Sequence, residues 1–542
     1  MKQILRIATA ALIFSNVSFG LAATLPQDAP VHHVLLISVD GLHSDDLAHF
    51  IAAHPGSTLA RLANDGIEYG NTRTVEPADS FPGLLALVTG GTPAVTGVYY
   101  DDSYDRRLAA PGSDCSRLGT RVLYDESLDL PAADGHDTID PAKLPRDPQR
   151  GCAPVYPHTF LRVNTIFEAI RAAGGYTAWT DKHPTYELVE GPSGHGVDDL
   201  FLPEIGANHE GQHEAKTPGI TGSLARTENY DDLKADAIVN EIDGMAHDGH
   251  RRTTVPSVFG LNMQAVNVAQ KLYGYRDADG DLTPGVDQAI TYVDTLLARF
   301  MVELDRKRLR DDTLVIVTAK HGNGPIDPAL LDKIDEHRVS AVIDAAAPGA
   351  LAQLTTDHGA LVWLHDASTT AAVTAALREH AGELGISDVI SGERLAQRFP
   401  SPAQDSRTPD IVIVSRDGVI FTSPSDGKLA EHGGFHEDDV RVALLLSNPR
   451  LVNRGLRVSY PVSTTQVAPT ILAALGVPPE ALEAVAQEGT PVLPAMRWMS
   501  VRVSASSPAS ASSLTPAAAG TPTRNLSGPL ALDQLGMHPL GK

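Results

Sequence analysis

Cysteine is scarce in this sequence, which has only Cys115 and Cys152 in 542 residues. In an oxidising compartment one pair of cysteines usually forms one disulfide, so we expect a bridge between these two. Two free thiols, or a metal held by the pair, are the alternatives, and neither suits an exported chain as well. The segment between them is rich in Asp, Pro, Gly and Arg, which predicts a long surface excursion.

Positive charge is also in short supply. Lys and Arg number 43 against 67 Asp and Glu, which gives a formal net charge of −24. A broad basic surface for polymeric nucleic acid or anionic lipid is therefore not expected. The acidity suits solubility, and a local positive site for a small anion remains compatible with it.

Long apolar runs are missing after the N-terminus, so no membrane span is expected in the rest of the chain. Residues 1–23 begin with Lys2 and Arg6, continue as a short apolar stretch and end in small residues. This pattern predicts a signal peptide cleaved near Ala22 or Ala23. A membrane anchor is the alternative, but the stretch is short for one. We expect an exported protein, either periplasmic or secreted.

Short apolar, β-branched runs alternate with helical periodicity along the rest of the chain. Such runs are typical of strands covered on both faces, and their alternation with helices predicts a mostly parallel α/β sheet with helices on both sides. The predicted strands are residues 33–41, 258–263, 313–322, 411–415 and 442–448.

The predicted domain organisation has three parts. Residues 24–499 form one catalytic domain, within which residues 330–409 interrupt the strand and helix pattern as a smaller inserted α+β subdomain. Residues 500–542 are of low complexity and are expected to be disordered.

Polar side chains follow three of the predicted strands. Asp40 ends the first, His321 ends "TLVIVTAKH", and His432 lies in "EHGGFHEDD" before the last strand. Sites in open α/β sheets form at the carboxyl ends of strands. Ser80 stands at the start of a predicted helix, where a serine is usually an N-cap but can also hold a phosphate at the helix N-terminus.

These blocks resemble, in order, the alkaline phosphatase superfamily, and most closely its type I phosphodiesterase/nucleotide pyrophosphatase branch. The resemblance rests on Asp40, "DSFPGLLALVTGGTPAVTGVYYDDSYD", "KHG", "HGGFHEDDVRVALLLSNP" and "TTQVAPTILAALG". It implies two zinc ions that clamp a phosphoryl group, and a Ser or Thr nucleophile that forms a covalent phospho-enzyme.

Residue by residue, the resemblance makes Ser80 the nucleophile and places it with Asp40 and His321 on one metal. His432 matches a ligand of the other metal. The family has Asp directly before its histidine, where this sequence has Lys320. It also has an Asp, and a His four residues later, where this sequence has "GLNMQAVNVAQKL". Three protein ligands besides the nucleophile cannot fill two zinc shells of about four ligands each.

We therefore expect one divalent ion, most plausibly zinc, on Asp40, Ser80, His321 and His432, or no metal, rather than two. Lys320 is a candidate catalytic residue that places an ammonium where a metal would lie.

Lys182 and His183 in "WTDKHPTYE", together with Asn262, are candidate substrate-binding residues. A surface turn before Pro184 is the alternative for the first pair.

Two functions follow. The first is an exported phosphoric ester hydrolase, of the phosphodiesterase or nucleotide pyrophosphatase kind, that acts through Ser80 on a small phosphate ester or nucleotide. The second is a catalytically weakened relative that binds a phosphorylated ligand or partner. The intact nucleophile block favours the first. A sulfatase fits less well, because "SFPGL" lacks the arginine of that branch.

Overall fold

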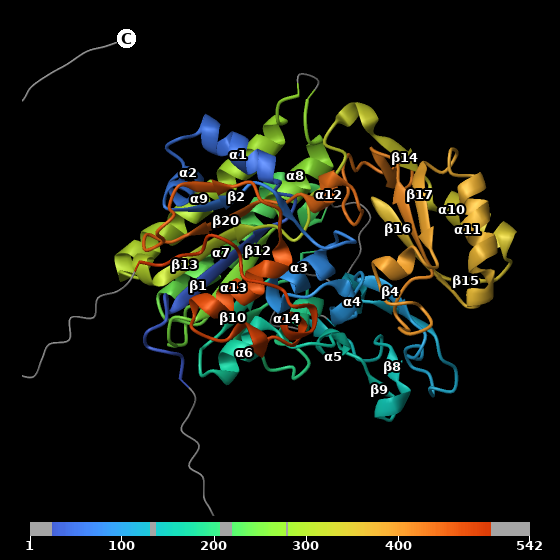
Figure 1. Ribbon diagram of the computed structural model, residues 1–542, viewed down its shortest axis with the longest axis horizontal. Coiled ribbons are helices and arrows are strands. Elements are labelled where there is room, and N and C mark those ends of the chain that lie inside the picture. The colour runs from blue at the N-terminus through green and yellow to red at the C-terminus, as the bar shows by residue number, and fades with distance from the viewer. Residues whose placement is uncertain (1–23, 131–136, 206–218, 278–279, 500–542) are drawn as a thin grey trace, which may run out of the picture. The chain divides into compact units, whose positions relative to one another are not determined.

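The computed structural model describes residues 24–130, 137–205, 219–277 and 280–499 (Figure 1). The predicted signal peptide, residues 1–23, and the predicted tail, residues 500–542, lie outside these ranges. Among the described residues no helix has both the length and the apolar character needed to cross a bilayer.

An eight-stranded sheet forms the centre of the fold, in the order β11-β10-β12-β1-β13-β20-β2-β21. The first five strands are mutually parallel, whereas β20 runs antiparallel to both of its neighbours. The prediction of a mostly parallel α/β sheet is confirmed. The strands are β1 (His33–Val39), β2 (Gly66–Tyr69), β10 (Ala178–Thr180), β11 (Asp199–Phe201), β12 (Val258–Met263), β13 (Thr313–Thr318), β20 (Leu444–Ser447) and β21 (Leu456–Val458).

Helices cover both faces of this sheet (Figure 1). Alternate side chains of β1 enter different cores, because successive residues of a strand point to opposite faces. Val34 and Leu36 pack with α3 (Ser80–Thr89), α6 (Ile166–Ala172) and α13 (Val467–Ala474). Leu35 and Ile37 pack with the opposite set of helices. That set is α1 (Ser44–Ala53), α2 (Thr58–Asn64), α7 (Leu224–Ile242), α8 (Ala265–Tyr273) and α9 (Pro284–Lys307).

A second, four-stranded antiparallel sheet lies in the chain between β13 and β20, with the order β15-β16-β18-β17. It comprises β15 (Leu351–Thr356), β16 (Gly359–Leu364), β17 (Ile386–Ser391) and β18 (Ile411–Ser415), together with α10 (Glu336–Ala346) and α11 (Thr370–Glu379). The predicted insertion, residues 330–409, falls within this region. The apolar run 411–415 is a strand of this sheet and not of the central sheet as we expected. Likewise, 442–448 contributes an antiparallel strand. A strand buried on both faces does not reveal its partner or direction by its composition.

The remaining elements are short and connect the larger ones. The strands are β3 (Thr72–Arg73), β4 (Asp102–Asp105), β5 (Thr120–Leu123), β6 (Asp129–Leu130), β7 (Thr138–Ile139), β8 (Arg146–Asp147), β9 (Ala153–Pro154), β14 (Asp332–Ile334), β19 (Val419–Phe421) and β22 (Val462–Ser463). The helices are α4 (Pro93–Thr96), α5 (Pro157–Phe160), α12 (Glu437–Val440) and α14 (Glu483–Glu488), and Pro184–Glu190 forms a 3-10 helix.

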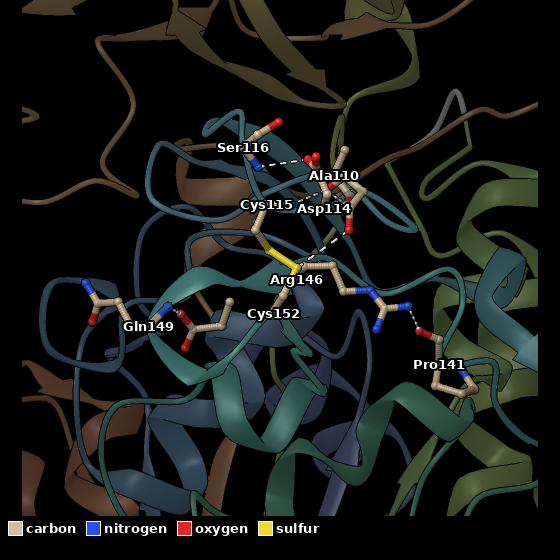
Figure 2. The surroundings of a disulfide bond; sticks show 10 residues. Ala110, Asp114, Cys115, Ser116, Pro141, Arg146, Gln149 and Cys152 are labelled. Carbon is tan, nitrogen blue, oxygen red and sulfur yellow. Dashed lines mark hydrogen bonds between the residues drawn. A yellow bond between two sulfur atoms is a disulfide. The ribbon is translucent and has the colours of Figure 1, made fainter.

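Cys115 and Cys152 form a disulfide, as predicted (Figure 2). Their Cα atoms lie 6.0 Å apart, and the bond closes a loop across 37 positions of sequence. Cys152 lies between β8 and β9, so the disulfide links this small hairpin to the preceding loop that contains Cys115.

Candidate active site

The carboxyl ends of four parallel strands and the start of one helix meet at one point. This convergence follows from the sheet order, since β10, β12, β1 and β13 are adjacent and parallel. Asp40 follows β1, and Ser80 opens α3. Asn262 lies near the end of β12, and Gln264 lies just after it. Lys320 and His321 follow β13, and residues 181–183 follow β10.

Ser80 is the first residue of α3, and the cap before it is Asp79. The Asp79 carboxylate accepts a hydrogen bond from the Phe81 amide at 3.0 Å. Ser80 is thus not needed as the cap, and its Oγ lies 3.1 Å from His321 Nε2 and 3.3 Å from Lys182 Nζ. The hydroxyl is placed between a ring nitrogen and an ammonium.

The backbone carbonyl of Gly322 sets the tautomer of the His321 ring. Nδ1 lies 2.8 Å from the Gly322 carbonyl oxygen, which can only accept. Nδ1 therefore carries hydrogen, and the neutral ring has a free lone pair at Nε2. That lone pair faces Ser80 Oγ, which is the arrangement in which a histidine accepts a serine proton.

Asp40 is fully buried and surrounded by donors. Asn262 Nδ2 donates to it at 2.8 Å and Gln264 Nε2 at 2.7 Å. The ammonium groups of Lys182 and Lys320 each lie 3.6 Å from Asp40 Oδ2. Burial alone would raise the pKa of this carboxyl, but Lys320, His321 and Lys182 outweigh burial and hold the pKa well below its usual range.

Lys320 is completely buried, with its ammonium between Asp40 and Asp181, at 3.6 and 3.4 Å. It lines neither of the two cavities described below. Lys182 differs, because it lines both of them and also contacts Ser80. The structure thus places Lys182, rather than Lys320, where a bound anion would meet an ammonium.

Of the two other candidate substrate-binding residues, His183 lines the cavities and Asn262 does not. His183 lines both cavities, and its Nδ1 lies 2.7 Å from Glu204 Oε1. Burial, together with the charge of Lys182, lowers the pKa of His183 to about 4, so its ring is neutral at neutral pH. Asn262 is completely buried behind Asp40 and is absent from the lining of either cavity.

His432 stacks face to face on His321, with ring centroids 3.7 Å apart and planes 5° apart. Its Nδ1 lies 3.1 Å from Glu431 Oε1 and its Nε2 lies 3.7 Å from Asp79 Oδ1. Burial lowers the pKa of His432 well below its usual value, and the charges of His321 and Lys271 lower it further. A neutral ring therefore borders the space above Ser80.

Two cavities meet over this centre. One, of about 300 Å³, is lined by Ser80, and the other, of about 500 Å³, by Gln264 and Val268. Both are bordered by Lys182, His183, Lys271, Lys428 and His432. The smaller cavity also carries six carboxyl groups, namely Asp79, Asp101, Asp125, Glu126, Asp357 and Glu431.

The side chains at this centre do not fit a pair of zinc ions. Both oxygens of Asp40 accept amide hydrogens, and two ammonium groups lie where a metal bound to it would lie. In the described part of the chain, no group of three or more His, Cys, Asp or Glu side chains is arranged to hold a metal. Asp40, Ser80 and His321 do meet, and His432 reaches them through its stacked ring.

Three residues of this centre were not singled out by sequence reasoning: Tyr186, Glu431 and Lys271. Glu431 pairs with both Lys271 and Lys428, the latter at 2.8 Å. Tyr186 stands three residues after His183 in the same quoted stretch. No periodicity or motif marks any of the three, because their roles arise from contacts between distant segments.

A model of the type I phosphodiesterase/nucleotide pyrophosphatase family matches residues 34–439. The chain belongs to this family. A comparison with curated protein sequences found no match. The family match spans the nucleophile block, the Lys320 loop and the loop that carries His432, so the departures from the family's metal ligands lie inside the matched region.

Solved structures share the fold of this family member. Murine ectonucleotide pyrophosphatase/phosphodiesterase 5 is 16% identical with a TM-score of 0.53, over 82% of this chain and 95% of its own. The alkaline phosphatase PafA is 14% identical with a TM-score of 0.54, over 83% of this chain and 96% of its own. At these identities the likeness establishes the fold.

Proposed function

We propose that this protein is an exported phosphodiester hydrolase in which Ser80 attacks phosphorus without a two-zinc centre. The observation that carries the proposal is the chain of contacts from Ser80 Oγ to His321 Nε2 and from His321 Nδ1 to the Gly322 carbonyl. It supplies a nucleophile, a base in the correct tautomer and a group that orients the base.

In the proposed first step, Ser80 Oγ attacks phosphorus and gives its proton to His321 Nε2. The bond from phosphorus to the leaving oxygen breaks, and that oxygen takes a proton from the imidazolium. In the second step, water gives a proton to His321 and attacks the phosphoserine, and Ser80 Oγ leaves and recovers its proton. The sum is diester plus water giving monoester plus alcohol.

Lys182 is proposed to bind the phosphoryl group. Its ammonium contacts Ser80 Oγ and borders both cavities, so it is close to the oxygens that gain charge during attack. Ser80 lies at the N-terminal end of α3, where the helix dipole also favours an anion. His183 and His432, both neutral, are proposed to contact the substrate as hydrogen-bonding groups.

Two features favour a diester over a monoester. Two cavities meet at Lys182, which leaves room for an organic group on each side of phosphorus. The smaller cavity is rich in carboxyl groups, and two of its lysines, Lys271 and Lys428, are already paired with Glu431. A dianionic monoester would meet more repulsion there than a monoanionic diester. Inactive murine ectonucleotide pyrophosphatase/phosphodiesterase 5 has been solved with AMP, which supports a nucleotide-like substrate.

The test is hydrolysis of an aryl phosphodiester by wild type and Ser80→Ala, with and without a chelator. We expect Ser80→Ala to lower kcat by roughly 10³-fold or more, because it removes the nucleophile, and the chelator to have little effect on wild type. A phosphoserine at position 80, trapped by acid quench and located by peptide mass, would support the covalent step. Equal rates for wild type and Ser80→Ala would exclude the proposed nucleophile. Phosphate binding without turnover would favour the weakened, ligand-binding relative.

A further inference from the structure

Tyr186 lies against both ammonium groups of the active site. It belongs to the 3-10 helix Pro184–Glu190, is only 1% exposed and lines the smaller cavity. The Lys320 ammonium lies 4.5 Å from the centroid of its ring, and the Lys182 ammonium lies 5.7 Å from it. One aromatic ring therefore contacts both ammonium groups that lie beside Asp40.

The Lys320 ammonium is completely buried, and the free-energy cost of removing this charge from water must be offset by attraction to its neighbours. Asp40 and Asp181 provide two carboxylates, and the face of Tyr186 provides a third attraction that is strongest when water is excluded. The ring itself is held in place by Phe81, whose centroid lies 4.9 Å away at an interplanar angle of 60°. Phe81 directly follows the proposed nucleophile, so the ring also connects the lysines to the start of α3.

We propose that Tyr186 is a positioning residue for the phosphoryl transfer proposed above, and that its ring fixes Lys320 and Lys182 in the geometry that presents Lys182 to the phosphoryl group. The inference rests on the proposed function for its reaction, while its effect on anion binding can be measured separately. Lys320 then acts behind the site by holding Asp40 and Asp181, and Lys182 acts at the substrate.

The Tyr186 hydroxyl lies near the Ser80 side chain, and both residues line the smaller cavity. Burial raises the pKa of this phenol well above its usual value, and the nearby Asp181, Asp40 and Asp79 raise it further. The hydroxyl therefore keeps its proton. The ring and the hydroxyl can be separated experimentally, since phenylalanine keeps the first and lacks the second.

The experiment compares Tyr186→Phe, Tyr186→Leu and the control Tyr69→Leu. Tyr69 is an equally buried tyrosine on β2, two strands away from β13, with its hydroxyl donating to the Pro494 carbonyl. On an aryl phosphodiester we expect Tyr186→Leu to lower kcat about ten- to thirty-fold, the size of a desolvated cation–π contact. Tyr186→Phe should stay within about threefold of wild type. Tyr69→Leu should lower the thermal midpoint and leave kcat near wild type.

Binding of inorganic phosphate, measured by titration calorimetry, tests the same inference without turnover. We expect Tyr186→Leu to weaken phosphate binding about tenfold and Tyr186→Phe to bind as wild type does. The inference is overturned if Tyr186→Leu loses only thermal stability, as Tyr69→Leu does, and keeps both kcat and phosphate affinity. If Ser80→Ala hydrolyses the diester as fast as wild type, the proposed reaction fails, and the phosphate titrations alone then decide the role of Tyr186.

Discussion

The start of α3 and the ends of β1, β12 and β13 face each other across the active site, and different interactions hold them. At the start of α3, backbone geometry dominates: Asp79 caps the helix, and Gly83 packs directly on the Lys320 loop. A Cβ at Gly83 would lie 2.2 Å from the Lys320 carbonyl oxygen, so only glycine allows this approach. At the strand ends, charged and amide side chains dominate: Asp40 pairs with Lys320 and Lys182, and Asp181, which follows β10, pairs with Lys320.

We infer that this difference lets one side keep the pattern that the family resemblance implies while the other departs from it. A helix start held by its cap and a close backbone contact offers few alternatives for the residue at position 80. A cluster of side chains can exchange one set of balancing charges for another. Lys320 stands where the family resemblance implies a carboxylate, and its ammonium lies between Asp40 and Asp181, while Gln264 donates a hydrogen bond to Asp40.

The largest predicted effect comes from rebuilding the metal shell at the strand ends. Gln264 and Val268 are four residues apart, and both border the larger cavity with His432. We assign them, on this spacing and on the contact of Gln264 with Asp40, to the positions of the family's Asp and its His four residues later. We expect the triple variant Lys320→Asp, Gln264→Asp, Val268→His to bind two zinc ions per chain. The gain in unfolding free energy on zinc binding should be several kcal/mol, up to about 10 kcal/mol.

Lys320→Asp alone is the matched control for the triple variant. It should not hold two zinc ions, because the second shell still lacks ligands. Elemental analysis after dialysis, with thermal melts in zinc and in chelator, measures both variants. Two zinc ions bound by Lys320→Asp alone would show that the ligands are assigned to the wrong residues.

The next effect is on stability and follows from removing one charge of the buried cluster. Lys320→Met leaves Asp40 and Asp181 without the ammonium between them, and breaking such a buried pair costs roughly 3–5 kcal/mol. The double variant Lys320→Met, Asp181→Asn should recover part of that loss, since one of the two carboxylates is gone. Urea denaturation measures both, with Ser80→Ala as a control on the other side of the site. A loss below about 1 kcal/mol for Lys320→Met would mean that Lys182 alone neutralises both acids.

Much of this site could be predicted from the sequence, because strand ends in a parallel sheet converge. Apolar runs followed by Asp40 and His321 predicted that these residues lie at the strand ends, and the family resemblance placed Ser80 with them. The structure brings all three together.

Other features depend on which distant segments pack together, and composition does not encode that. The strand 411–415 is as apolar as the central strands yet pairs with β16 and β17. Tyr186 resembles any other tyrosine in a turn until Lys320 is packed against it. Lys320 and Lys182 are both plausible anion ligands in sequence, and only burial separates their roles.

The smallest predicted effect is a difference in how stability depends on pH on the two sides of the site. It compares Asp40 at the strand ends with Asp79 at the start of α3. Asp40 has a pKa held well below its usual range by Lys320, His321 and Lys182, despite burial. Its stabilising contribution is therefore complete above about pH 4, near the unfolded pKa, and is lost only as pH falls through the folded pKa. Asp79 is the opposite case, because burial raises its pKa even though it caps α3. The folded protein then binds the Asp79 proton more tightly than the unfolded chain does. The contribution of Asp79 to the stability of the folded protein therefore falls as pH rises from about 4 through the folded pKa.

Asparagine removes the charge at both positions and keeps the helix cap at position 79, so the two variants should have different pH profiles. The destabilisation caused by Asp40→Asn should be constant from pH 8 to pH 5. Asp79→Asn should gain on wild type as pH rises from about 4 through the folded pKa of Asp79, whereas Asp79→Ala should lose about 1 kcal/mol for the missing cap. Urea denaturation at pH 4, 5, 6.5 and 8 gives all three profiles. If Asp79→Asn instead lost stability as pH rises, the Asp79 carboxylate would be stabilised by charge as Asp40 is. The start of α3 would then be held by electrostatics as the strand ends are, and the contrast between the two sides would disappear.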